Sequence, residues 1–226
     1  MKSWLLNWGF IIVFAFAGQN DTTLSFDTSE GTLISVDISP NGKTIAFDLL
    51  GHIYLMPSSG GTAEAITKGT SWNMLPRFSP DGEKILFTSD RSGSDDLWVQ
   101  NIKTGNMKNV SKMDIPVHQG TWSTDGKHVF GTALNMKVRH PVYRFNMYGK
   151  KQEIIPAGSR SPVNHFAMHP TNNLIYFSHG DGPLYRSGDR IKTYNIQNGE
   201  IKTYVDRAGG CLLYTSDAAD EEDSVD

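Results

Sequence analysis

The stretch Phe78–Phe87 reads FSPDGEKILF and contains the signals that decide the fold. An apolar residue ends one segment, and Ser79-Pro80 begins a turn in which proline holds φ near −65°. Asp81-Gly82 follows, and this pair suits the positive φ angles of a tight β-hairpin. The next segment, Lys84–Phe87, is rich in apolar residues that favour strands. The stretch therefore predicts two antiparallel strands joined by a short turn.

The same pattern recurs three more times, at intervals of 40 to 46 residues. That interval is about the length of one blade of a β-propeller. The other copies are Ile38–Phe47 (ISPNGKTIAF), Trp122–Phe130 (WSTDGKHVF) and Met168–Phe177 (MHPTNNLIYF). The last copy has Asn172-Asn173 in place of Asp-Gly, and asparagine also tolerates the left-handed backbone region.

Each copy is followed by two more strand-like segments, which gives four strands per repeat, the unit of a propeller blade. In the second repeat these are Asp96–Gln100 (DLWVQ) and the residues after the Thr104-Gly105 turn. No segment after residue 17 shows a sustained apolar period of 3.6 residues, so we expect no helix there. The sequence predicts an all-β fold, a β-propeller over residues 18–210 with blades at about 30–67, 72–111, 117–156 and 161–205.

Propellers have about four to eight blades and close by pairing the first blade with the last. With about four blades present, we expect an incomplete propeller whose terminal blades expose apolar faces. Thr22–Phe26 (TTLSF) is a candidate strand for completing the final blade.

Residues 1–17, MKSWLLNWGFIIVFAFA, have the pattern of a secretory signal peptide. Lys2 supplies the positive charge, a mostly apolar stretch follows, and Ala15-Phe16-Ala17 forms a small-x-small cleavage site. The apolar stretch is shorter than the roughly 20 residues that span a bilayer. An uncleaved N-terminal anchor is the alternative interpretation. In both cases we expect the body of the protein to be exported, with no membrane contact beyond this segment.

Residues 211–226 form an acidic tail that contains the single cysteine, Cys211. Within it, Cys211–Glu221 (CLLYTSDAADE) resembles the translation of an adapter used to prepare sequencing libraries. On that interpretation the tail is an artefact and the genuine chain continues past Gly210. The alternative is a natural tail, disordered because of its composition. A single cysteine excludes an intrachain disulfide and any zinc motif built from several cysteines.

The repeats resemble those of the TolB-type propeller family. Pro76–Gly93 (PRFSPDGEKILFTSDRSG) is similar to the family pattern PxFSPDGxxIxFTSDRxG, and the resemblance covers almost all of residues 30–205. Glu30–Tyr54 is also similar to the propeller at the front of large exported bacterial amidohydrolases. In that family the propeller precedes a metal-dependent barrel that acts on C–N bonds. The resemblance therefore implies a catalytic domain with a divalent metal beyond Gly210. TolB-like repeats also precede serine peptidases.

We assign no catalytic, cofactor-binding or metal-binding residue within the chain. An amidohydrolase metal site would contain closely spaced histidines such as His-x-His, which do not occur here. His165 and His169 are four residues apart, which places them on one face only in a helix, and they fall in a predicted strand and turn. The remaining histidines are interpreted as surface or turn residues: His52, His118, His128, His140 and His179.

Serine chemistry is not indicated either. The sequence contains no Gly-x-Ser-x-Gly nucleophile elbow and no phosphate-binding glycine loop. Ser58 and Ser59 lie beside Gly60-Gly61, but a serine without a placed base is a turn residue.

Two groups of residues admit a functional interpretation beside a structural one. In Ser89–Gly93, we expect Asp90 to cap the turn and to pair with nearby backbone or with Arg91. We expect three tryptophans to pack between blades: Trp72, Trp98 and Trp122. The alternative for these is an exposed aromatic cluster at the mouth of the channel, which could bind a partner.

Three functions remain open. The first is an accessory propeller that gates, shapes or scaffolds access to the catalytic domain of an exported amidohydrolase. The second is a stand-alone TolB-like platform that binds envelope proteins, and the third is the propeller of a serine peptidase. The expected partners are thus a hydrolase domain in the same protein or envelope proteins, in the bacterial periplasm or outside the cell. A formal net charge of −3 gives no reason to expect nucleic acid.

Overall fold

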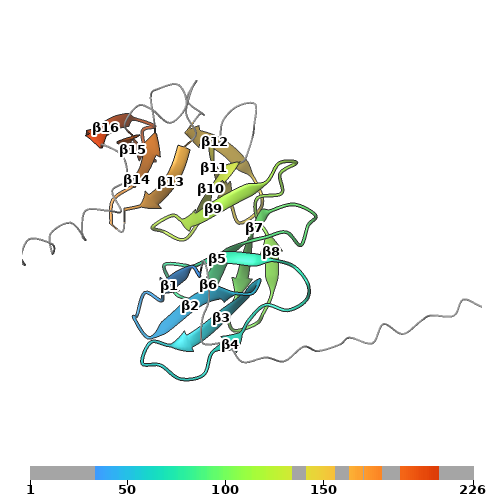
Figure 1. The fold of residues 1–226 in the computed structure, drawn as a ribbon. Helices are drawn as coiled ribbons and strands as arrows, with labels where there is room; N and C mark the ends of the chain where they lie inside the picture. Colours follow the sequence, from blue (N-terminus) through green and yellow to red (C-terminus); the bar gives the residue numbers. More distant parts are fainter. Residues whose placement is uncertain (1–33, 134–140, 156–162, 170, 180–188, 209–226) are drawn as a thin grey trace, which may run out of the picture. The chain divides into compact units, whose positions relative to one another are not determined.

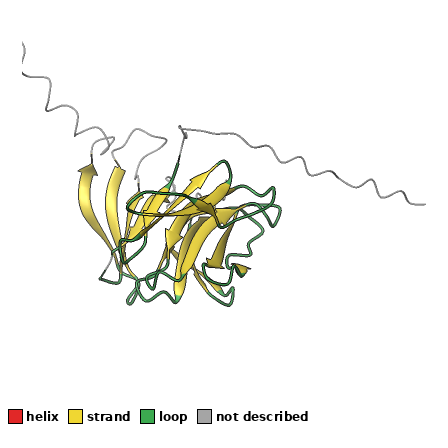
Figure 2. Ribbon diagram, turned by 90° about the horizontal axis from the view of Figure 1, so that it is seen from below, coloured by secondary structure: helices red, strands yellow, loops and turns green. Residues whose placement is uncertain are grey.

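The computed structural model describes residues 34–133, 141–155, 163–169, 171–179 and 189–208. Regular structure in these ranges consists of sixteen β-strands and no helix (Figures 1 and 2). The predicted all-β propeller fold of four-stranded blades is confirmed. The predicted signal peptide, Thr22–Phe26, His140 and the acidic tail lie outside the described residues. Among the described residues, no helix is long and apolar enough to cross a membrane.

The strands form four antiparallel sheets, each in chain order. Sheet 1 contains β1 (Val36–Ile38), β2 (Thr44–Leu49), β3 (His52–Pro57) and β4 (Glu64–Ala65). Sheet 2 contains β5 (Asn73–Phe78), β6 (Lys84–Ser89), β7 (Asp96–Asn101) and β8 (Met107–Asn109). Sheet 3 contains β9 (Val117–Trp122), β10 (His128–Ala133), β11 (Val142–Asn146) and β12 (Lys151–Ile155). Sheet 4 contains β13 (Val163–Met168), β14 (Leu174–His179), β15 (Asp189–Asn195) and β16 (Ile201–Ala208). Each sheet lies within one predicted blade, except that β16 extends beyond residue 205.

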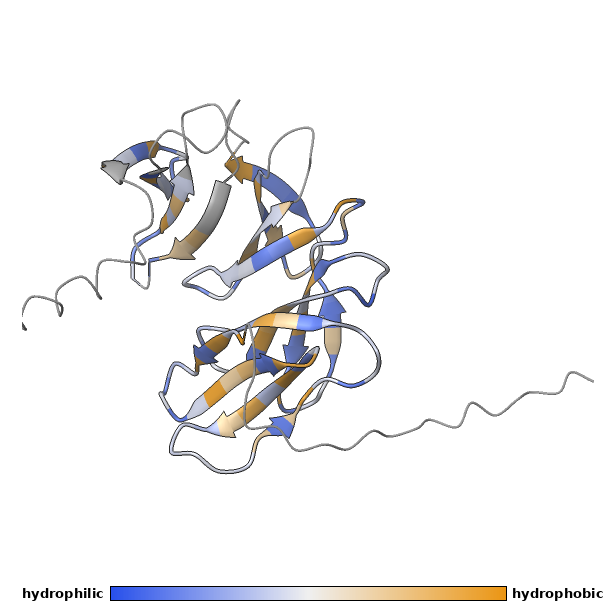
Figure 3. Cartoon of the chain, in the orientation of Figure 1, coloured by the Kyte–Doolittle hydropathy of each residue, from blue (hydrophilic) through white to orange (hydrophobic). Residues whose placement is uncertain are grey.

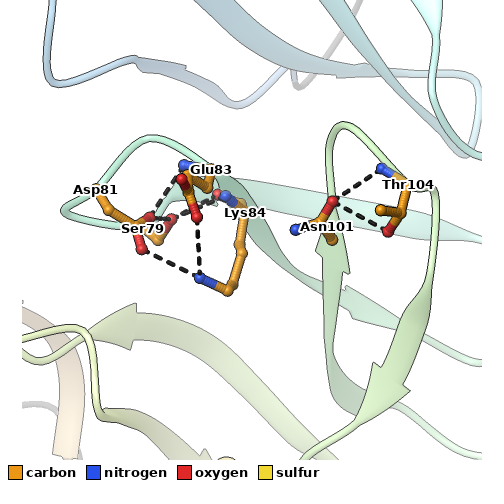
Figure 4. Close-up of polar contacts among 6 residues, drawn as sticks. All are labelled: Ser79, Asp81, Glu83, Lys84, Asn101 and Thr104. Atoms are coloured by element: carbon orange, nitrogen blue, oxygen red, sulfur yellow. Dashed lines mark hydrogen bonds and ion pairs between the residues drawn. The ribbon is translucent and has the colours of Figure 1, made fainter.

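The turn between the first two strands of sheet 2 follows from its Ser-Pro-Asp-Gly motif (Figure 4). In sheet 2, Ser79 Oγ donates to Asp81 Oδ1 and accepts from Lys84 N at 2.9 Å. Asp81 Oδ1 also accepts from Glu83 N at 3.0 Å, and Gly82 takes a φ of 73° that favours glycine. Burial opposes ionisation of Asp81, but its hydrogen bonds from Ser79, Glu83 and Lys84 outweigh this and lower its pKa to about 2.

Hydrophobic residues lie in the strands of all four sheets (Figure 3) and pack between neighbouring sheets. Three clusters join sheets 1 and 2, sheets 2 and 3, and sheets 3 and 4. Full burial of one such side chain contributes about 1.5–3 kcal/mol, so these contacts hold the blades together.

Glycine allows a particularly close approach between sheets 2 and 3. A Cβ added to Gly131 on β10 would lie 2.6 Å from Leu97 Cδ1 and 2.7 Å from Val117 Cγ1. A Cβ added to Gly120 on β9 would lie 2.9 Å from a methyl carbon of Leu86. Only a residue without a side chain fits at these positions without moving the packed leucines.

Candidate functional site

A bulge recurs in the first strand of three successive sheets. β5, β9 and β13 each carry one extra residue at the same point of their pairing with the next strand. At this point Leu75 and Gln119 have φ angles of 58° and 54°. Such angles are uncommon for residues other than glycine and cost energy that the surroundings must compensate.

A buried carboxylate holds the bulge of sheet 2. Asp48 on β2 is 7% exposed. Its Oδ2 accepts from Leu75 N at 2.7 Å, and its Oδ1 accepts from Ser35 N at 2.7 Å. Asp48 therefore ties sheet 1 to the strained residue of sheet 2.

In sheet 2 the residue at the repeat position of Asp48 is Thr88. The junction between sheets 2 and 3 therefore lacks a carboxylate at this position. Thr88 Oγ1 is buried and has no hydrogen-bonding partner among the described residues. Gln119 Oε1, at the bulge of β9, is in the same state. The carboxylate bridge is thus a feature of the first junction.

The Ser89–Gly93 turn has a structural role, but Asp90 accepts from the backbone before β5 and not from its own turn as expected. Asp90 Oδ1 accepts from Trp72 N at 2.8 Å, so Asp90 caps the backbone just before β5. Arg91 donates to Ser89 Oγ and to Asn73 Oδ1, and its guanidinium lies 5.0 Å from the centre of the Trp98 ring. Burial lowers the pKa of Arg91 from its usual value, and the charge of Asp90 opposes that shift.

The expectation that all three tryptophans pack between blades is wrong for one of them. Trp122 is 5% exposed and Trp98 packs against the cluster between sheets 1 and 2. Trp72 is 53% exposed because it lies in the connection between β4 and β5, outside the sheets, with its ring over Gly51. A Cβ on Gly51 would lie 3.0 Å from that ring.

The neighbouring turn adds a second exposed apolar side chain. Leu50, directly before Gly51, is 55% exposed and has a φ of 51°. We call Leu50 and Trp72 the Leu50–Trp72 surface. Its backbone is held on one side by Asp90, which accepts from Trp72 N, and on the other by Asn73, which donates to Gly51 O at 2.7 Å.

Sequence reasoning missed the pairing of one histidine with an acid. His118 Nε2 on β9 lies 2.9 Å from Asp95 Oδ2, in the turn between β6 and β7. The two residues are distant in sequence, and no local pattern announces their contact. The pair joins sheets 2 and 3 at the turn end of β6.

The other described histidines have structural contacts. His169 Nδ1 accepts from Asn172 N at 3.0 Å, so it caps the turn of sheet 4 where sheet 2 has Ser79. His52 Nδ1 lies 3.4 Å from Thr67 Oγ1. Burial and the charge of Arg144 lower the pKa of His128, against a smaller opposing effect of Asp125. The side chains of His165 and His179 lie outside the described part.

The described ranges contain no group of three or more His, Cys, Asp or Glu side chains that could hold a metal ion. The polar side chains described above, such as Asp48, Asp90 and His169, make hydrogen bonds within turns and across the junctions between blades. The Leu50–Trp72 surface is one of several places where the described residues expose large apolar side chains.

The family known as the TolB beta propeller domain matches residues 11–214. A TolB homolog of Chlorobium luteolum is 30% identical over 88 residues, which is 38% of this chain and 20% of that protein. Tricorn protease homolog 1 of Streptomyces coelicolor is 30% identical over 89 residues, 39% of this chain and 8% of that protein.

Solved structures give the same fold. TolB from Acinetobacter baumannii superposes with a TM-score of 0.61 at 24% identity, covering 76% of this chain and 43% of that one. This chain thus spans less than half the length of each of these three relatives.

Proposed function

Because the chain belongs to the TolB β-propeller domain family, we propose that it is a non-catalytic scaffold that shapes or gates access to the catalytic domain of a larger exported hydrolase. The observation that supports this is the use of its charged residues. Asp48, Asp81, Asp90 and Arg91 are all engaged in hydrogen bonds to backbone or to neighbouring side chains. A general acid or base must instead reach a substrate proton.

The Leu50–Trp72 surface supplies a contact point for such a domain. An exposed aromatic and an exposed aliphatic side chain on well-held turns favour burial against a partner. The strained φ of Leu50 is the kind of local cost that persists at functional positions.

For the catalytic domain we propose a metal-dependent amidohydrolase, with its divalent metal bound outside this chain. The support is the similarity of Glu30–Tyr54 to the propellers of that family. We further propose a periplasmic or secreted location, on the basis of the signal-like residues 1–17.

Two alternatives rest on the relatives. The TolB homolog of Chlorobium luteolum favours a stand-alone propeller that binds envelope proteins. The tricorn protease homolog favours the propeller of a peptidase.

A hydrolysis assay tests the non-catalytic claim. The purified chain is incubated with chromogenic amides and esters, with and without added Zn²⁺, and compared with its His118→Ala variant. We expect no turnover above buffer for either protein. Turnover that copurifies with the chain and disappears in His118→Ala would contradict the proposal, because a contaminating hydrolase would survive that substitution.

A further inference from the structure

The indole ring of Trp72 is supported on one side and open to solvent on the rest of its surface. A Cβ added to Gly51 would lie 3.0 Å and 3.3 Å from two carbons of this ring, so the ring packs against the glycine backbone. The whole residue is nevertheless 53% exposed. Trp72 therefore offers an aromatic surface whose position is fixed before any partner binds.

A carboxylate is held beside this tryptophan. Asp90 Oδ1 accepts from Trp72 N at 2.8 Å, and Asp90 N donates to Trp72 O at 3.4 Å. Asp90 is exposed, and none of the ion pairs formed among the described residues includes it. The aromatic surface thus has an exposed negative charge next to it.

The neighbouring arginine does not lie over that surface. The Arg91 guanidinium donates to Asn73 Oδ1 and lies 5.0 Å from the centre of the Trp98 ring. The chain therefore already contains one guanidinium placed on an indole with an oxygen acceptor beside it. Trp72 and Asp90 provide the same two partners, an indole and an oxygen acceptor, on the outside of the molecule.

This combination of groups is suited to a cation. Tryptophan is the aromatic side chain that attracts cations most strongly. A guanidinium fits better than an ammonium, because it is planar, stacks on aromatic rings and donates two hydrogen bonds to a carboxylate. Leu50, which is 55% exposed and precedes Gly51, adds an apolar contact for the aliphatic stem of an arginine.

We propose that Leu50, Trp72 and Asp90 bind an arginine side chain of the hydrolase catalytic domain. The guanidinium lies over the indole and donates to the Asp90 carboxylate, and the arginine stem contacts Leu50. The source of the arginine rests on the proposed function, whereas the recognition of a guanidinium rests only on these three residues.

Titration of the full chain with N-acetyl-argininamide, followed by NMR at the backbone amide of Gly51, tests the recognition chemistry. We expect a saturable shift with an affinity in the millimolar range. The matched probe is N-acetyl-citrullinamide, which has nearly the same shape but no charge. It should bind about fivefold more weakly, because it lacks the attraction of a cation to the indole and the carboxylate. N-acetyl-lysinamide should fall between the two.

Variants assign the binding to these residues. Trp72→Leu keeps an apolar side chain and should weaken binding of the arginine probe about fivefold or more. Asp90→Asn keeps an acceptor for Trp72 N but removes the charge, and should weaken binding about two- to fivefold. Tyr148→Leu is the control and should leave binding unchanged. Tyr148 is another exposed aromatic residue, but Lys108 Nζ already lies 5.5 Å from the centre of its ring.

Several results would overturn the proposal. These are no saturable shift at about 100 mM probe, equal affinity for the arginine and citrulline probes, or unchanged affinity in Trp72→Leu or Asp90→Asn. Circular dichroism checks the fold of each variant, and Trp72→Phe replaces Trp72→Leu if that variant does not fold. The probe needs no catalytic domain, so its failure to bind would leave the proposed function standing. A gene without such a domain would instead refute the proposed function and leave the guanidinium site intact.

Discussion

Replacing Asp48 by alanine should destabilise the chain more than replacing Thr88, the residue at the same repeat position in sheet 2. The carboxylate is 7% exposed and accepts two backbone hydrogen bonds of 2.7 Å, from Ser35 and from the strained Leu75. Alanine would leave both N–H groups without this partner.

The expected loss of stability follows from the number of hydrogen bonds that the substitution removes. A hydrogen bond to a charged group contributes about 1.5–3 kcal/mol. Two such bonds, one of them near the surface, give an expected loss of about 3 kcal/mol for Asp48→Ala. Asp48→Asn keeps one acceptor oxygen and should lose about half of that. Thr88→Ala, at the same repeat position, should change stability by less than about 1 kcal/mol, because Thr88 Oγ1 has no described partner to lose.

Urea unfolding followed by circular dichroism measures these free energies, and amide hydrogen exchange at Leu75 reports the bond itself. Since about 1.4 kcal/mol corresponds to a tenfold change, exchange at Leu75 should accelerate roughly a hundredfold in Asp48→Ala. Equal losses for Asp48→Ala and Thr88→Ala would refute the reasoning, as would unchanged protection at Leu75.

Three further substitutions test other parts of the structure. Gly131→Ala should destabilise the chain by about 1–3 kcal/mol through overpacking between sheets 2 and 3, and an unchanged urea midpoint would contradict this. Asp81 has a folded pKa of about 2 against about 4 in an unfolded chain. Its contribution is therefore present above pH 4 and is lost as the pH falls through about 2. Because its side chain is 50% exposed, that contribution should be about 1 kcal/mol or less. Asp81→Asn should flatten the pH dependence of stability in this range while changing stability little at pH 7, since Asn41 fills this position in sheet 1. A loss of stability below pH 4 as large as that of the unsubstituted chain would argue against this contribution of Asp81. Arg91→Lys should cost about 1–2 kcal/mol, because lysine lacks the planar group that lies over Trp98. Thermal unfolding measures this loss, and a midpoint equal to that of the unsubstituted chain would count against the stacking.

The sequence predicts those features of the fold that depend on contacts between residues close together in the chain. The hairpin at Ser79–Lys84 closes through contacts within five positions, so its motif is sufficient to place it, and the repeat of that motif predicts the four sheets. The fourth copy of the motif, which is the least similar, forms its turn in the same way, because His169 caps the turn at the position where the other three copies have serine.

Contacts between sheets could not be predicted in the same way. The bonds of Asp48 to Leu75 and of Asp95 to His118 depend on how one sheet is positioned against the next. Aromatic character alone predicts burial for Trp72, yet its place in a connection leaves it exposed. A carboxylate inside an apolar strand signals that a donor must exist, but the identity of that donor comes only from the packed structure.

The most direct test of the central claim, that this propeller serves a larger exported hydrolase, is to sequence the source locus across codon 210 on a single long read. The account predicts that the frame continues past Gly210 into residues other than CLLYTSDAADE and reaches His-x-His motifs. A Gly-x-Ser-x-Gly motif there would identify a serine peptidase in place of the amidohydrolase. Native DNA that encodes CLLYTSDAADE and stops after Asp226 would contradict the claim and favour a stand-alone binding propeller.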